Sequence, residues 1–251
     1  MKIIFRADDL GFSEAINYGI AKAVKDGVIS SVGMMTNMDS IKHGYNLIND
    51  IDLCLGQHTN ICVGKPLCDP ALIPSLVDEN GMFCSSKEIR ARENDSIVLE
   101  ECELEIEAQL NKFIEIVGRK PDYFEGHAVF SINFFKALEN VAKRNNLFYC
   151  NPMDKEWSKE TGIDCGKMFK MDEKGLYDPY AYIMNDEADI MDKECSVLVF
   201  HPGYLDQYIL EHSSFTLIRP METEFLCSNK LKNWIKENNI EVVDFRNYTR
   251  K

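Results

Sequence analysis

The chain has 251 residues, of which 45% are hydrophobic and 27% charged, and its formal net charge is −13. This acidic balance argues against nucleic acid or an anionic membrane as the main partner, because both attract basic surfaces, and it suits a neutral or cationic small molecule. No apolar stretch approaches the roughly 20 residues that span a bilayer, and the N-terminal sequence MKIIFRADD becomes acidic too early for a signal peptide, so we expect a cytoplasmic protein.

The first predicted elements are a strand, an acidic turn and a helix. Residues 2–7 (KIIFRA) form a short β-branched and aromatic run, which is typical of a strand. Residues 13–25 carry apolar side chains spaced as on an amphipathic helix, and Ser13 suits its N-cap. The later strands are predicted at residues 30–37, 53–59, 121–127, 147–150, 196–203 and 241–245. The later helices are predicted at residues 40–49, 99–117, 133–145 and 222–238.

This alternation of strands with helices predicts parallel βαβ units and an α/β fold in a single domain, residues 1–251. About seven strands without a Gly-rich dinucleotide fingerprint favour a distorted, TIM-like (β/α) barrel, and a doubly wound open sheet is the alternative. Two long stretches, about residues 60–98 and 151–195, interrupt the alternation after strands. In a barrel they would lie over the C-terminal face, where such enzymes keep their active sites, so we interpret them as substrate-binding lids.

Five polar side chains lie where predicted strands end. Asp8 and Asp9 close the first strand, and three of the five histidines follow later strands, at His58, His127 and His201. A lone histidine at a strand end is usually structural, but a barrel gathers its strand ends around one axis. One carboxylate and two imidazoles suit a divalent metal that keeps open positions for water and a substrate oxygen. The second carboxylate would serve as a base, provided that the turning chain lets both aspartates reach one site.

Other polar and sulfur-containing residues receive structural interpretations. The nine cysteines are odd in number and include no C-x-x-C pair, so we expect reduced thiols, most of them buried, rather than disulfides or a zinc cage. Arg6, beside the acidic pair, is expected to face outward from its strand, with tuning of that pair as the other interpretation. His43 and His212 are expected at the surface, with His212 within reach of the mouth of a pocket.

The stretches around the polar strand ends resemble the motifs of a known family. Residues 6–20 (RADDLGFSEAINYGI) resemble an opening A-D-D-x-G motif followed by an Asn-x-G-I helix. Residues 56–67 (GQHTNICVGKPL) resemble G-x-H-x-x-L-x-x-G-x-P-L, with Ile61 at the usual leucine, and residues 201–206 (HPGYLD) match H-P-G-Y-x-D. On these ordered motifs the chain resembles the YdjC-like carbohydrate deacetylases over nearly its whole length.

This resemblance implies a (β/α)-barrel hydrolase that removes N-acetyl groups from amino sugars with a divalent metal. Magnesium is the metal most implied, and zinc, manganese or cobalt are possible. Asp9, His58 and His127 match the metal ligands, Asp8 the base, and His201 the later histidine that faces the substrate. Family members often show S-H-H-H-V-H where this chain has only His127, a departure that bears on which sugar is the substrate and on the level of activity.

The implied substrate is an acetylated mono- or oligosaccharide, and the resemblance makes a homodimer a possible assembly. In amide hydrolysis the metal activates water, Asp8 removes a proton, and His201 or protonated Asp8 delivers one to the leaving amine. Tyr204 and Asp206 are predicted to hold sugar hydroxyls, with a packed tyrosine and a capping aspartate as the other interpretation. A metal-dependent sugar isomerase or phosphoester hydrolase, or a non-catalytic sugar-binding protein, are the alternative functions.

Overall fold

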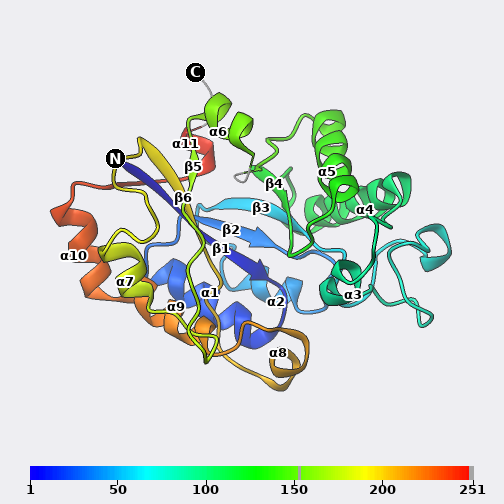
Figure 1. The fold of residues 1–251 in the computed structure, drawn as a ribbon, viewed down its shortest axis with the longest axis horizontal. Coiled ribbons are helices and arrows are strands. Elements are labelled where there is room, and N and C mark those ends of the chain that lie inside the picture. The colour runs from blue at the N-terminus through cyan, green and yellow to red at the C-terminus, as the bar shows by residue number, and fades with distance from the viewer. Residues whose placement is uncertain (152–153, 249–251) are drawn as a thin grey trace.

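The structure is a computed structural model that describes residues 1–151 and 154–248. Its seven strands run parallel in one sheet (Figure 1). The strands are β1 (Lys2–Leu10), β2 (Ser31–Met34), β3 (Cys54–Thr59), β4 (Tyr123–Gly126), β5 (Asp164–Cys165), β6 (Cys195–Phe200) and β7 (Glu241–Val243). Their order is β4-β3-β2-β1-β6-β5, and β7 pairs with β1.

The central strand β1 explains why the sheet curls. One edge of β1 pairs with β6, while the other edge pairs with β7 near its beginning and with β2 near its end. Two strands therefore diverge from the same edge, and among the described residues β4 and β5 stay unpaired with each other. The result is an open half of a barrel, which confirms the predicted α/β fold and the distorted (β/α) barrel.

The helices confirm most of the predicted pattern. Figure 1 shows α1, α2 and α9 along one side of the sheet and α4 beside α5 beyond β4. The helices are α1 (Glu14–Lys25), α2 (Ile41–Asn46), α3 (Ser86–Arg90), α4 (Leu99–Val117), α5 (Ile132–Asn145), α6 (Lys155–Thr161), α7 (Pro179–Met184), α8 (Gln207–His212), α9 (Ile218–Cys227), α10 (Asn229–Glu237) and α11 (Phe245–Tyr248), with a 3-10 turn η1 (Pro70–Leu72). Among these described residues, no helix is both long enough and apolar enough to cross a bilayer.

Two predicted elements are wrong. The single helix expected over 222–238 is divided into α9 and α10 at Ser228, whose extended backbone ends α9 and whose hydroxyl accepts the Leu231 N–H as the N-cap of α10. The strand expected at 147–150 makes only an isolated bridge from Tyr149 to β4. At Ser228, capping by the serine side chain overrides the apolar pattern that predicted one helix. At 147–150, only Tyr149 pairs with the edge strand β4, so the apolar run does not form a strand.

Close packing of α1 positions the chain after β6. The side chain of Ser13 accepts the Ile16 N–H and begins the helix as predicted. A Cβ at Gly19 would lie only 2.3 Å from the Cα of Gly203, so α1 and the loop after β6 approach as closely as two glycines allow. The Tyr204 N–H then donates to the Ala15 carbonyl at 3.1 Å.

All nine cysteines are free and most are buried, as expected.

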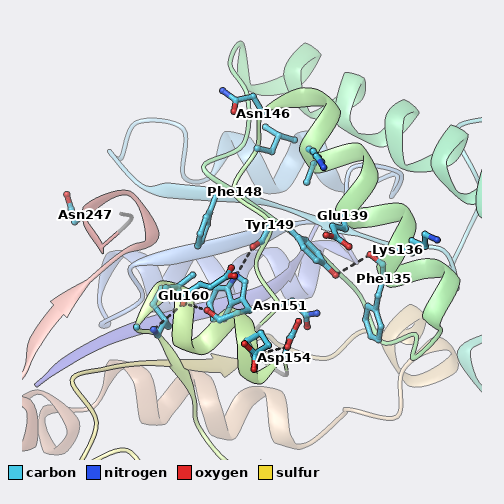
Figure 2. Close-up of a pocket in the computed structure, with 18 of the residues that line it drawn as sticks. Phe135, Lys136, Glu139, Asn146, Phe148, Tyr149, Asn151, Asp154, Glu160 and Asn247 are labelled. Carbon is cyan, nitrogen blue, oxygen red and sulfur yellow. Dashed lines mark hydrogen bonds between the residues drawn. The ribbon is translucent and has the colours of Figure 1, made fainter. Parts of the chain in front are cut away.

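Residues 154–163 of the second predicted lid pack near the amino-terminal end of β1. Trp157 belongs to one core cluster with Ile4 and Val243. Beside it, a hollow of about 1460 Å³ lies between α5 and α6 (Figure 2), and its lining includes Lys2 at the beginning of β1. None of the five polar strand-end residues lines this hollow, although its volume exceeds the roughly 530 Å³ of a groove at the carboxyl-terminal end of the strands.

A later part of the same lid segment lies at the carboxyl-terminal end of the strands. Phe169 stacks on Tyr177 with ring centroids 3.9 Å apart and also contacts Phe215. The ring of Phe215 lies edge-on against that of His201, which follows β6 directly. The described residues of this lid, 151 and 154–195, are therefore divided between the two ends of the sheet, and among them the later residues lie on the face with the predicted site.

Candidate active site

Both aspartates at the end of β1 reach one histidine. Asp9 has φ of 78°, in the left-handed region that Asp tolerates better than most residues, and this turns the chain. Asp9 Oδ1 lies 3.2 Å from His58 Nε2, and Asp8 Oδ2 lies 3.9 Å from His58 Nδ1. The two carboxylates therefore approach opposite nitrogens of the same buried ring, and their positions are not equivalent.

Three ligand atoms converge at the carboxyl ends of β1, β3 and β4. Asp9 Oδ1 lies 3.2 Å from both His58 Nε2 and His127 Nδ1, and the two ring nitrogens are 2.9 Å apart. Ligands at about 2.1 Å from an octahedral ion lie about 3 Å from each other. Asp9 Oδ1 is also buried without a hydrogen-bond partner among the described residues. These three side chains could hold a divalent metal ion.

A third carboxylate, which the sequence analysis missed, fixes His58. Glu125 faces His58 across the β3–β4 pairing and is hydrogen-bonded to its Nδ1. Such a partner behind a ligating histidine sets the ring orientation and leaves Nε2 for the metal. The signal was in the sequence EGH, because side chains two apart along an extended chain share a face. Glu125 in β4 and His127 directly after this strand both contact His58.

The expectation that Arg6 faces outward is wrong. Its side chain is buried, and its Nη2 donates to Asp8 Oδ2 at 2.7 Å and lies 3.6 Å from Glu125. The period of two explains this, because Arg6 and Asp8 lie on the same face of β1. Asp8 Oδ1 has no hydrogen-bond partner among the described residues. A Cβ at Gly33 would lie 2.7 Å from this oxygen, so glycine in β2 makes room for Asp8.

Arg219 and Glu222 of α9 complete the site and were not predicted. Arg219 Nη2 donates to Asp9 Oδ2 at 2.8 Å, which leaves Asp9 Oδ1 for an ion. Glu222 accepts hydrogen bonds from the backbone N–H of His201 and from the Tyr177 hydroxyl. Nδ1 of His201 is buried without a partner among the described residues. No short motif marks Arg219 or Glu222, although their i, i+3 spacing places them on one helix face.

The charges of the site shift the pKa values of its members. Burial raises the pKa of Asp9, but the Arg219 and His127 charges outweigh it and hold that pKa well below its usual range. Burial lowers the pKa of His127, but the carboxylate of Asp9 outweighs it and raises that pKa to about 9. Burial lowers the pKa of His201 to about 4, so this ring is neutral near pH 7. Only a neutral imidazole binds a metal, so an ion would compete with a proton for His127.

The structure places the remaining predicted residues outside the cluster of Asp9, His58 and His127. Asp206 Oδ1 accepts the Ile209 N–H at 2.9 Å as the N-cap of α8, which is the capping interpretation. The Tyr204 side chain is exposed. The half-buried His43 contacts Asn17, and the exposed ring of His212 stacks on that of Tyr208. That tyrosine lines a groove, so His212 does lie near the mouth of a pocket.

Comparison with known proteins agrees with the fold and the motifs. A family model described as YdjC-like protein matches residues 2–237. Carbohydrate deacetylase 2 of Listeria innocua is 32% identical, with 100% of both chains covered. Chitooligosaccharide deacetylase of Citrobacter koseri is 28% identical, with 97% of each chain covered. A crystal structure of a protein from Enterococcus faecalis V583 has a TM-score of 0.82 at 22% identity over 99% of each chain, which is a likeness of fold.

Proposed function

The chain belongs to the YdjC-like protein family, and on this premise we propose that it is a metal-dependent carbohydrate deacetylase. It would hydrolyse the N-acetyl group of an acetylated amino sugar or oligosaccharide into acetate and an amine. The observation that carries this proposal is the convergence of Asp9, His58 and His127 on one point beside the additional carboxylate of Asp8. The names of the curated relatives supply the substrate class.

The residues around the proposed ligands have supporting roles. Arg219 holds Asp9 Oδ2 and Glu125 holds His58 Nδ1, so each ligand presents its other polar atom to the same point. When bound there, a divalent ion supplies Lewis-acid polarisation of the acetyl carbonyl and activation of water. Magnesium is proposed on the family resemblance, and the mixed nitrogen and oxygen donors also suit zinc, manganese or cobalt.

We assign proton transfer to Asp8. Its Oδ2 is fixed by Arg6, while its Oδ1 has no partner among the described residues and is free to accept the proton of the attacking water. The protonated carboxyl then delivers that proton to the leaving amine, which becomes the free amino group of the sugar. His201 is neutral near pH 7, so we propose that it forms a hydrogen bond to the substrate through its Nδ1, which has no partner among the described residues.

One experiment tests the proposed function against its alternatives. Purified protein is assayed for acetate release from N-acetylglucosamine and its β-1,4-linked dimer, and its metal content is measured in parallel. We expect one acetate for each new amine, loss of turnover after chelation, and unequal recovery with Mg²⁺, Zn²⁺, Mn²⁺ or Co²⁺. An isomerase, a phosphoester hydrolase or a sugar-binding protein would release no acetate. Full turnover by demonstrably metal-free protein would reject the metal mechanism.

A further inference from the structure

A groove opens beside the proposed metal ligands. Its volume of about 530 Å³ lies within the range of roughly 300–1,000 Å³ that is usual for small-molecule sites. Its walls come from the segments that follow β1, β2, β3 and β6, and from Met82 in the first predicted lid. Because these segments follow the carboxyl ends of parallel strands, the groove and the metal ligands share one end of the sheet.

Phe12 connects the groove with the proposed metal ligands. Its ring centroid lies 6.3 Å from that of His127 and 6.0 Å from that of Tyr208, so this one ring contacts a residue of each region. Phe12 and Tyr208 line the groove, whereas Asp9, His58 and His127 do not. A ligand that fills the groove and also presents an acetamide to the proposed metal ligands would therefore contact Phe12.

The lining of the groove has the character of a sugar site. Phe12, Met38, Met82 and Tyr208 give apolar walls, and carboxylates such as Asp39 can accept hydrogen bonds from hydroxyl groups. An apolar lining with a few polar groups that fix orientation is the usual composition of a small-molecule site. Burial and the nearby charge of Asp39 both raise the pKa of Tyr208, so its hydroxyl remains a hydrogen-bond donor.

Tyr208 is held in place by its surroundings. The ring of His212 stacks on it with centroids 4.2 Å apart, and His212 Nδ1 lies 2.9 Å from the Tyr208 carbonyl oxygen. Phe12 contacts the same ring edge-on. A ring that is fixed before the ligand arrives loses little freedom on binding, which favours affinity.

We propose that this groove binds the sugar unit next to the acetylated one, with Tyr208 as a specificity-determining residue. The inference rests on the proposed function and makes the substrate an oligosaccharide rather than a monosaccharide. Tyr208, four residues after the tyrosine singled out in HPGYLD, is thus an aromatic side chain that touches this sugar, together with Phe12. Its position in α8 follows from the N-cap at Asp206.

The test separates sugar binding from deacetylation. Glucosamine and its β-1,4-linked dimer carry no acetyl group, so their binding to the metal-loaded protein can be measured by calorimetry without turnover. We expect the dimer to bind about tenfold more tightly than the monomer, the effect of one good aromatic anchor. Tyr208→Ala and Met82→Ala, which alter the lining from α8 and from the first predicted lid, should each remove most of this preference. Tyr18→Ala, at an exposed tyrosine outside the groove, is the matched control.

The outcomes are distinct. A dimer preference that is lost in both groove variants and kept in Tyr18→Ala supports the subsite, whether or not acetate is released. Equal binding of monomer and dimer by the natural protein, or a preference that survives in both groove variants, overturns it. Acetate release is measured separately, so a protein that deacetylates without preferring the dimer would retain the proposed function and lose only this inference.

Discussion

Replacing each of the adjacent aspartates by asparagine distinguishes the proposed base from the proposed ligand. Asp9→Asn removes the only anionic ligand, because the other two are imidazoles. We expect metal affinity to fall by more than the roughly 10–100-fold that loss of an outer partner costs. The change also leaves the buried Arg219 without the negative charge of its 2.8 Å partner, and an uncompensated buried charge of this kind costs about 3–5 kcal/mol of folding free energy. Excess metal should restore part of the activity.

Asp8→Asn should behave differently. Arg6 keeps Glu125 at 3.6 Å, so the loss of stability should be smaller than in Asp9→Asn. Metal should remain bound and substrate affinity near normal, while kcat falls by roughly 10²–10⁴, the usual contribution of a general acid or base. No amount of metal should restore it.

The two variants are compared by metal titration, acetate release and urea unfolding, with Asp26→Asn at the exposed end of α1 as the control. The assignment is refuted if Asp8→Asn is the variant that loses its metal. In that case Asp8, which lies 3.9 Å from His58 Nδ1, would act by orienting this ligand rather than by taking a proton. It is equally refuted if the two variants lose activity and metal in the same proportion.

Three further predictions concern neighbouring groups. Glu125→Gln should weaken metal binding by about 10–100-fold in a metal titration, and unchanged affinity would show that Glu125 does not orient His58. Burial raises the pKa of Glu222 from 4.5 to about 7, so the folded state holds a proton that the unfolded state loses, and unfolding free energy should fall by on the order of 3 kcal/mol as pH rises from 4.5 to 7. Urea unfolding of Glu222→Gln should lack this decline, and an identical decline in both proteins would contradict it. Gly33→Ala should abolish activity because its Cβ would crowd Asp8, and a fully active variant would show that Asp8 has room to move.

The parts of the site that could be predicted are those fixed by local chain order. Asp8, Asp9 and His58 lie in the last residues of their strands and His127 directly follows β4. Parallel strands bring their ends to one edge, so their meeting follows from the pattern once the chain turns at Asp9. The inward orientation of Arg6 and Glu125 could have been predicted in the same way. Each lies two positions along an extended chain from a predicted site residue, Asp8 or His127, and therefore shares its face. The prediction that Arg6 faces outward was wrong because it ignored the two-residue alternation of side chains along a strand.

Other parts depend on packing that no local pattern encodes. Arg219 contacts Asp9 across 210 positions of sequence, through the way α9 packs against α1. A motif search finds no reason to connect an arginine in IRPMETEF with an aspartate near the N-terminus. Hydrophobic periodicity also cannot predict the break at Ser228, because it depends on a single N-cap residue. Nor can it predict β5, because this strand consists of only two paired residues.

The charge balance of the buried site connects its fold to its chemistry. Asp8, Asp9 and Glu125 supply three carboxylates, and Arg6 and Arg219 supply two guanidinium groups, so the cluster has an excess negative charge when both imidazoles are neutral. In the metal-free protein protons can balance it, which is why the carboxylates raise the pKa values of His58 and His127 against the effect of burial. A divalent ion would replace these protons at the same nitrogens. The buried charges therefore favour a cation there, and binding of an ion would be coupled to release of protons.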